Sequence, residues 1–234
     1  MRVFAVGDLH GDYKSFKKSL EVFDKNKKNK DILIFLGDYA DRGENGVEII
    51  IELNEILEKR NDIFALKGNH EDYEEGIPRF LPCDLIEEAN KKYPGGWEAF
   101  WNNILKSFLK KLKQALIIEK VLFVHGGISS RIKSKEDLFK KEYEKDLIWS
   151  DPFSLEYEDH GYYSFSKEEA ERLLKAIDCK LIVRSHQPYK AKDGKPFFEL
   201  DKKVVTINSS SYYGKPFVLV VNAKEAKVEK VIPL

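Results

Sequence analysis

The amino-acid sequence predicts an α/β fold in a single domain spanning residues 1–234. Three short apolar runs lie in the first seventy residues, and each is followed by Gly-Asp or Gly-Asn. Continuous apolar runs that alternate with helical segments are typical of parallel strands buried on both faces. The chain length is within the usual range of one domain, and no change of composition divides it.

The first three strands are expected at 3–6, 32–36 and 63–66. The two segments between them carry apolar residues at three- and four-residue spacing, as a helix with one buried face requires. These residues are Phe16, Leu20 and Phe23 in the first segment and Ile49, Ile50, Leu53, Ile56 and Leu57 in the second. The strands and helices therefore form βαβ units.

Residues 71–115 are aromatic, charged and permissive of helix. Proline and glycine would break this segment into short helices, at Pro78, Pro82 and Pro94-Gly95-Gly96. We expect a helical insertion here, packed over one end of the sheet.

The second half of the chain begins with a predicted hairpin at 116–118 and 121–124. Ser166-Lys167-Glu168-Glu169 is a capping box, which predicts a helix from there to about Ile177. The remaining strands are expected at 181–183, 204–207, 217–221 and 228–232.

Polar side chains follow five of these strands, at the carboxyl ends where α/β sheets bind ligands. They are Asp8 and His10, then Asp38, Asp41 and Arg42, then Asn69 and His70, then His125, and finally His186. Carboxylate, imidazole and amide donors without thiolate favour Mn, Fe or Zn. Six such ligands are too many for one ion, so two ions about 3.5–4 Å apart that share a carboxylate are expected, an arrangement suited to phosphoryl displacement.

Five motifs stand in order along most of the chain: Gly7-Asp8-Leu9-His10-Gly11, Gly37-Asp38-Tyr39-Ala40-Asp41-Arg42-Gly43, Gly68-Asn69-His70-Glu71, His125-Gly126-Gly127 and Arg184-Ser185-His186-Gln187. They resemble the signatures of the PPP-family serine/threonine phosphatases, within the calcineurin-like metallophosphoesterases. The intervals of 25 residues between Gly11 and Gly37 and 24 between Gly43 and Gly68 agree with that family. Trp149-Ser150-Asp151-Pro152 is similar to a further family element, and six motifs in order make coincidence negligible.

The resemblance implies a four-layer αββα fold, in which a central β-sandwich is flanked by helices. It implies that Asp8 and His10 bind the first metal, that Asn69, His125 and His186 bind the second, and that Asp38 bridges both. Two divalent ions are therefore expected, Mn²⁺ first, with Fe, Zn, Co and Ni as alternatives because the same ligands accept several ions.

The resemblance also implies catalytic roles. A hydroxide held between the ions would be the nucleophile, without a phosphoenzyme, because two cations depress the pKa of bound water. His70, kept cationic by Asp41, would protonate the leaving oxygen, and Arg42 would neutralise phosphate oxygens with its planar fork. Tyr212, in the run 209–213, is a candidate for the tyrosine of a late family motif.

Two departures from the family pattern stand out. Where the family has Asn-Asp-Arg-Gly, with a phosphate-binding arginine, this chain has Glu158-Asp159-His160-Gly161. We therefore expect His160 to contribute to phosphate binding when protonated. The continuation Asp72-Tyr73-Glu74-Glu75 also replaces the family's Cys-Ala-Ser-Ile, which indicates that substrate-side surfaces have diverged. Arg184 is expected behind the site, where it could orient His186 or another ligand.

The function predicted from these features is metal-dependent phosphomonoester hydrolysis, with phosphoserine or phosphothreonine in proteins as substrate and phosphotyrosine or small phosphoesters as further candidates. Hydrolysis of nucleotide anhydrides, as in bis(5′-nucleosyl)-tetraphosphatases, is the alternative. Those enzymes tend to carry Gly-Asn-His-Asp, so Glu71 and the intact Asp41-Arg42-Gly43 favour a phosphatase. A non-catalytic scaffold is disfavoured, because every metal ligand and His70 are present.

Composition excludes several classes of partner and site. Forty basic and forty acidic side chains give zero net charge, which argues against binding to nucleic-acid polymers or anionic membranes. Cys83 and Cys179 lie 96 positions apart without a C-x-x-C pair, so neither a disulfide framework nor a cysteine zinc site is expected, and a cytoplasmic location fits. The longest apolar runs are far shorter than the roughly 20 residues of a membrane-spanning helix.

Overall fold

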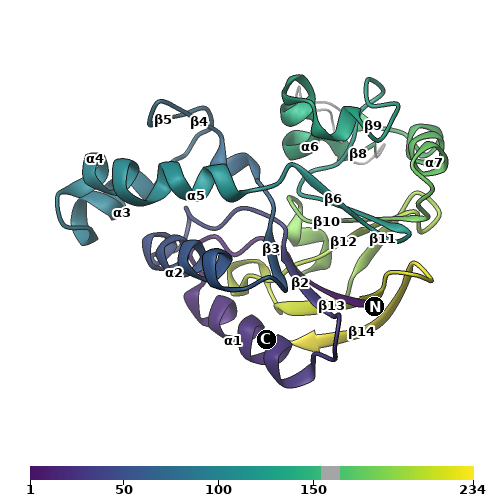
Figure 1. The fold of residues 1–234 in the computed structure, drawn as a ribbon, viewed down its shortest axis with the longest axis horizontal. Coiled ribbons are helices and arrows are strands. Elements are labelled where there is room, and N and C mark those ends of the chain that lie inside the picture. The colour runs from purple at the N-terminus through teal and green to yellow at the C-terminus, as the bar shows by residue number, and fades with distance from the viewer. Residues whose placement is uncertain (154–163) are drawn as a thin grey trace.

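The computed structural model describes residues 1–153 and 164–234, and Figure 1 shows two β-sheets stacked between helices. The first sheet contains β1 (Arg2–Val6), β2 (Ile32–Phe35), β3 (Ile63–Ala65), β13 (Phe217–Asn222) and β14 (Lys227–Pro233). Its order is β14-β13-β1-β2-β3. β1, β2 and β3 are parallel, which confirms the βαβ prediction, whereas β13 runs antiparallel to β1.

The second sheet has the order β11-β12-β10-β7-β6. Its strands are β6 (Ala115–Ile118), β7 (Val121–Val124), β10 (Leu181–Arg184), β11 (Phe197–Glu199) and β12 (Val204–Thr206). β6 and β7 form the predicted hairpin, and β10 is parallel to both β7 and β12. β11 was not predicted: it is a three-residue edge strand whose two phenylalanines are about 40% exposed, so it lacks the signal of a buried strand.

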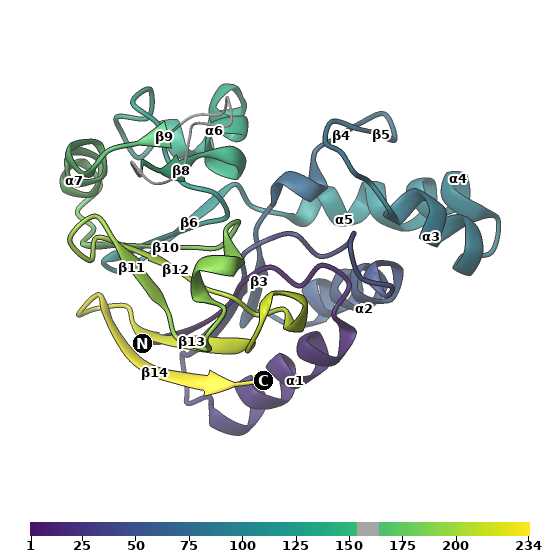
Figure 2. The same ribbon diagram turned by 180° about the vertical axis from the view of Figure 1, so that it is seen from behind.

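Side chains on β1 show how four layers arise. Phe4 and Val6 pack toward helices α1 (Tyr13–Asn26) and α2 (Gly46–Lys59). Val3 and Ala5 point the other way, into a core shared with the second sheet. Strands buried on both faces read as continuous apolar runs. α6 (Glu144–Trp149) and α7 (Lys167–Ala176) cover the outer face of the second sheet, so the chain is an αββα sandwich, as the resemblance implied (Figure 2).

The segment 71–115 contains short elements, as its prolines and glycines predicted. They are a hairpin of β4 (Tyr73–Glu74) and β5 (Ile77–Pro78), helices α3 (Leu85–Lys92) and α4 (Gly96–Phe100), a π-helical turn (Trp101–Leu105) and α5 (Lys106–Lys111). The helices pack against α2 and extend sideways from the sandwich (Figure 1). Phe108 of α5 contacts the ring of Tyr39, in the loop that follows β2, so the insertion also reaches the end of the first sheet.

Two further features complete the fold. The capping box at Ser166 is confirmed: its hydroxyl accepts the N–H of Glu169, and the Glu169 carboxylate accepts the N–H of Ser166. Short elements that periodicity could not predict are β8 (Asp151–Pro152), β9 (Ser164–Phe165) and the 3-10 helices Asn69–Glu71, Asp137–Phe139, Lys141–Tyr143, Pro188–Ala191 and Ser211–Tyr213. Within the part of the chain that the structure describes, no helix combines the length and apolar character needed to cross a bilayer.

Candidate functional site

The loops that follow β1, β2 and β3 in one sheet and β7 and β10 in the other meet at one edge of the sandwich. They bring together the six residues predicted as metal ligands, which are Asp8, His10, Asp38, Asn69, His125 and His186. All but His186 are at most 4% exposed. Buried polar groups at this density require partners.

Asp38 lies at the centre of this group. Its Oδ2 is 3.4 Å from Nε2 of His10, and its Oδ1 is 3.4 Å from Nε2 of His125. It takes part in two clusters that could hold a metal ion, one with His10 and His70 and the other with His125 and His186. In each cluster the ligand atoms lie within 4.8 Å of one another. A carboxylate common to two clusters is the arrangement that a pair of metal ions requires.

The orientation of two imidazoles is fixed by backbone carbonyls. Nδ1 of His10 is 3.0 Å from the carbonyl of Ala40, and Nδ1 of His125 is 2.9 Å from that of Leu36. Since a carbonyl only accepts, each Nδ1 carries the proton, and each Nε2 presents its lone pair to the centre of the site.

Among the described residues, the Nε2 lone pairs of these two rings therefore face the side-chain oxygens of Asp38 and Asn69. The Oδ1 atom of Asn69 is 2.9 Å from Nε2 of His125 and 2.9 Å from Nδ1 of His186. The Oδ2 atom of Asp8 is buried and has no hydrogen-bond partner among the described residues. A divalent cation satisfies lone pairs arranged in this way, so the residues fit a metal site.

The pKa values separate His70 from the other histidines. Burial lowers the pKa of His10 to about 3 and that of His125 to about 4, and burial beside cationic groups lowers the pKa of His186. These three are neutral near pH 7, as ligation requires. Burial alone would lower the pKa of His70 as well, but the charge of Asp38 and the hydrogen bond and charge of Asp41 outweigh it, so its pKa is raised.

His70 thus differs from the other three imidazoles, because its neighbours favour the protonated ring. Its Nδ1 lies 2.7 Å from Oδ2 of Asp41, and both side chains are at most 3% exposed. A protonated ring with one nitrogen committed to a carboxylate is a poor metal ligand. Asp8, whose Oδ2 is 3.8 Å from Nε2 of His10, is therefore the better third member of the cluster with His10 and Asp38.

Asp41 is held in place by the insertion. Its Oδ1 accepts the N–H of Asp84 at 2.6 Å and that of Leu85 at 2.9 Å, at the start of α3. The ring of Phe80, from the same segment, lies 4.6 Å from the ring of His70. Sequence patterns did not show this link between the insertion and the proposed acid.

The backbone at the site is strained. Five residues have φ values between 47° and 69°, in the left-handed region that non-glycine residues rarely adopt, and they are His10, Asp38, Asp41, Arg42 and His186. Such conformations persist where the surroundings enforce them and cluster at functional sites. Gly68 permits the closest approach of two of the loops, because a Cβ there would collide with the carboxylates of Asp38 and Glu71.

Sequence patterns assigned Glu71 no structural role, but it joins two of the ligand-bearing loops. Its buried carboxylate accepts the N–H of Asp38 at 2.9 Å, of Tyr39 at 3.1 Å and of Gly68 at 2.9 Å. Ser185 has a similar role, since its hydroxyl accepts the N–H of Asp8 at 2.8 Å. No sequence periodicity identifies such anchors, although the position of Glu71 in a motif was a usable signal.

Arg184 lies behind His186 and is fully buried. Its guanidinium donates to the carbonyl of Gly126, to Oε1 of Gln187 at 2.8 Å and to Oδ1 of Asp151 at 2.5 Å. Oδ2 of the same aspartate is 3.9 Å from Nε2 of His186. Arg184 therefore ties the loops that carry His125 and His186 to the Trp-Ser-Asp-Pro motif.

Three predicted site residues, Arg42, Tyr212 and His160, are not among the buried residues of the site. Arg42 is exposed, and its guanidinium lies over the ring of Tyr213, 5.6 Å from the centroid. Tyr212 is 54% exposed and packs against Gly43, on the outside of the motif loop. His160 lies outside the described residues.

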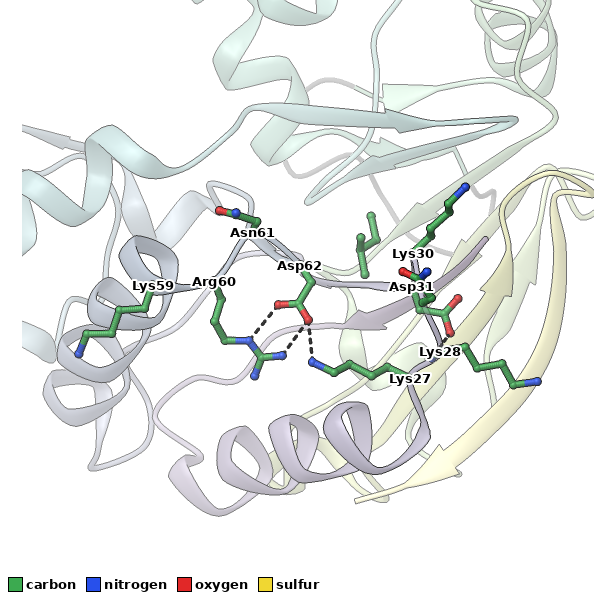
Figure 3. A pocket seen from close by; sticks show the side chains of 10 residues that line it. Lys27, Lys28, Lys30, Asp31, Lys59, Arg60, Asn61 and Asp62 are labelled. Carbon is green, nitrogen blue, oxygen red and sulfur yellow. Dashed lines mark hydrogen bonds and ion pairs between the residues drawn. The ribbon is translucent and has the colours of Figure 1, made fainter.

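A cavity of about 670 Å³ opens at the opposite edge of the sandwich, beside the residues that precede β2 and β3. Figure 3 shows its basic lining, in which Asp62 binds both Arg60 and Lys27. Asp24 pairs with the same two cations. Lys27 and Arg60 are thus each paired with two carboxylates at this cavity.

Comparisons with known proteins identify the family of this chain. A match to the calcineurin-like phosphoesterase family covers residues 1–190. Serine/threonine-protein phosphatase PP1-delta of Caenorhabditis elegans is 30% identical over 227 residues, a match that covers 90% of this chain and 70% of that protein. A probable serine/threonine-protein phosphatase of Encephalitozoon cuniculi is 28% identical, and the chain spans about half (52%) of its length.

Solved structures show the same fold. A protein serine/threonine phosphatase from Saccharomyces cerevisiae, with similarity to human phosphatase PP5, has a TM-score of 0.74 at 23% identity and covers 94% of this chain and 72% of its own. A cold-active protein-tyrosine phosphatase of a psychrophilic Shewanella has a TM-score of 0.66 at 16% identity, and the match covers 99% of this chain and 80% of that protein. A putative diadenosine tetraphosphatase has a TM-score of 0.59 at 16% identity, and the match covers 99% of this chain and 93% of that protein.

Proposed function

This chain belongs to the calcineurin-like phosphoesterase family, and from that premise we propose that it is a metal-dependent phosphomonoesterase that acts on phosphoserine or phosphothreonine in proteins. The observation that carries the proposal is the pairing of two features within one buried site. Among the described residues, carboxylate, amide and imidazole acceptors face one another around Asp38, and a histidine whose pKa is raised stands beside them. The first feature suits divalent cations and the second suits protonation of a leaving group.

The metal ligands in this proposal are shared between two positions. Asp8 and His10 would hold one ion, Asn69, His125 and His186 the other, and Asp38 both. When bound, two divalent cations supply Lewis acidity to phosphate oxygens and lower the pKa of water. Mn²⁺ is the first ion to test, because carboxylate, amide and imidazole ligands suit it.

The protein's own groups would handle the leaving oxygen and the phosphate. Asp41 holds Nδ1 of His70, which leaves the proton on Nε2 for the leaving oxygen. A serine or threonine alkoxide is a poor leaving group and needs this proton. Arg42, exposed at the mouth of the site, would bind phosphate oxygens in a bidentate manner.

His160 would assist phosphate binding in its protonated form. The observation behind this proposal is its position in the sequence, where the family pattern has a phosphate-binding arginine. We expect kcat/KM to lose a component as the pH rises past the pKa of the imidazole, because the cation is then lost. Identical pH profiles for the wild type and His160→Ala would contradict this role.

The experiment that tests the proposed function begins with removal of metal and re-addition of Mn²⁺. Turnover of an aryl phosphate, of phosphoserine, phosphothreonine and phosphotyrosine peptides and of a dinucleoside tetraphosphate is then compared, with Asp38→Asn as the metal-site control. We expect Mn²⁺-dependent hydrolysis with a preference for the phosphopeptides. Absence of metal-dependent turnover would refute the enzyme assignment, and a preference for the dinucleotide would favour nucleotide hydrolysis instead.

A further inference from the structure

The imidazole of His186 is held differently from the other two among the proposed metal ligands. The rings of His10 and His125 are fixed by backbone carbonyls that lie against Nδ1. Nδ1 of His186 lies instead 2.9 Å from Oδ1 of Asn69, which is itself a proposed ligand. His186 also has a φ of 66°, in the left-handed region, a conformation that persists only where the surroundings enforce it. The position of this ring therefore depends on what holds the turn that carries it.

A buried ion pair lies just after that turn. Lys190 belongs to the 3-10 helix Pro188–Ala191, and its Nζ donates to Oε1 of Glu199 in β11 at 2.6 Å. The two side chains are only 5% and 10% exposed. The same ammonium lies 5.8 Å from the centroid of the Phe197 ring, on the face of β11 that carries Glu199. The edge strand β11 therefore fastens the segment after His186 to the second sheet.

The carboxylate of Glu199 extends this contact to Arg184. Its Oε2 accepts the hydroxyl of Thr206 at 3.0 Å, and Oγ1 of Thr206 accepts Nη1 of Arg184 at 3.4 Å. These directions follow because a guanidinium only donates and an ionised carboxylate only accepts. Nη1 also donates to Oε1 of Gln187 at 2.8 Å. Arg184 precedes His186 and Gln187 follows it, so the hydrogen bonds hold the chain on both sides of the proposed ligand.

We propose that Lys190 and Glu199 are positioning residues for the imidazole of His186. Their ion pair holds the segment after that histidine on β11 and, through Thr206, keeps the Arg184 guanidinium in place. This inference rests on the metal site of the proposed function. A buried ion pair contributes little stability beyond that of apolar residues of the same volume, because desolvation offsets the attraction. Its directional hydrogen bonds, however, fix the position of a segment, and a metal ligand requires such support.

The test measures Mn²⁺ binding by calorimetry in the double variant Lys190→Met/Glu199→Gln. This variant removes both charges at nearly unchanged volume, so neither partner is left buried and unpaired. We expect one of the two ions to bind about 10-fold more weakly, the lower end for residues behind a ligand, because the pair acts through Arg184 and not on the ring. The other ion should keep its affinity.

The matched control is Lys120→Met/Asp178→Asn. It removes an ion pair that lies at the opposite end of the same sheet, before β7 and β10. Both ions should bind to this control as they bind to the wild type. Thr206→Val is a milder variant, because it breaks only the link between Glu199 and Arg184 at nearly unchanged volume. It should weaken the same ion as the double variant, by a smaller factor.

A second comparison shows whether the ion pair acts through His186. In a His186→Ala background, Lys190→Met/Glu199→Gln should cause no further loss of affinity, because the imidazole that the pair positions is absent. Unchanged affinity for both ions in the double variant, or an equal further loss in the His186→Ala background, would overturn the inference. A wild type that binds two Mn²⁺ ions without hydrolysing any phosphoester would refute the proposed function alone, and one that binds no Mn²⁺ would overturn both.

Discussion

Asp41→Asn tests whether His70 acts as an acid. The oxygen of the new carboxamide can still accept the N–H groups of Asp84 and Leu85, which now bind Oδ1. Its NH₂ group then faces Nδ1 of His70, where Oδ2 stood at 2.7 Å. Two donors cannot form a hydrogen bond with each other, so the imidazole must lose the proton on Nδ1 or carry its proton on Nε2 alone. The substitution also removes one of the charges that raise the pKa of His70.

The expected loss of kcat in Asp41→Asn follows from the loss of a positioned proton donor. General acid catalysis contributes about 10²- to 10⁴-fold, which is about 2.7–5.5 kcal/mol in the activation free energy. The loss should depend on the leaving group: it should approach the upper limit for a phosphoserine peptide, whose alkoxide needs the proton. It should be small for para-nitrophenyl phosphate, whose phenolate leaves without help.

The assay measures kcat for both substrates, with metal content determined by mass spectrometry and folding checked by thermal denaturation. Metal content should be unchanged, because Asp41 is not among the proposed ligands. Equal losses on the two substrates, or loss of bound metal, would show that Asp41 does not act through the proton of His70.

Three further predictions follow from the geometry. Asp38→Asn should lower the Mn²⁺ content toward zero while Asp8→Asn loses about one ion, as measured by mass spectrometry, since only Asp38 belongs to both clusters. Glu71→Gln should lower the free energy of unfolding by about 1–3 kcal/mol in denaturant titrations, because its NH₂ group faces backbone donors. Arg60 lowers the pKa of Asp62 from 3.8 to about 2. That pair should stabilise the fold above pH 3.8 and cease to do so as the pH falls through 2, so Asp62→Asn should cost less than about 1 kcal/mol at pH 6 and nothing well below pH 2.

The sequence predicted those features that depend on burial and on local turns. β1 after Arg2 and the whole of β2 are apolar because these strands are buried on both faces, and the ligand residues follow at their ends. Contacts between distant segments were not predictable in this way. The link from α3 to Asp41 joins residues 43 and 44 positions apart and leaves no periodic trace. Tyr212 is exposed whereas the ring of Tyr213 lies 5.7 Å from that of His10, a difference that depends on how one short turn is rotated and that the sequence did not show.

The insertion bears on the chemistry as well as on substrate recognition. The start of α3 holds Asp41 through two backbone N–H groups, and Phe80 packs on the ring of His70. Burial lowers the pKa of His10 and His125, whereas His70 is equally enclosed and has a raised pKa because Asp38 and Asp41 face it. The protonation state of His70 therefore depends on the position of Asp41, and that position depends on the insertion. A change in segment 71–115 that shifts the start of α3 would alter the proposed acid without touching a metal ligand, so divergence of this segment can tune the leaving groups that the site accepts.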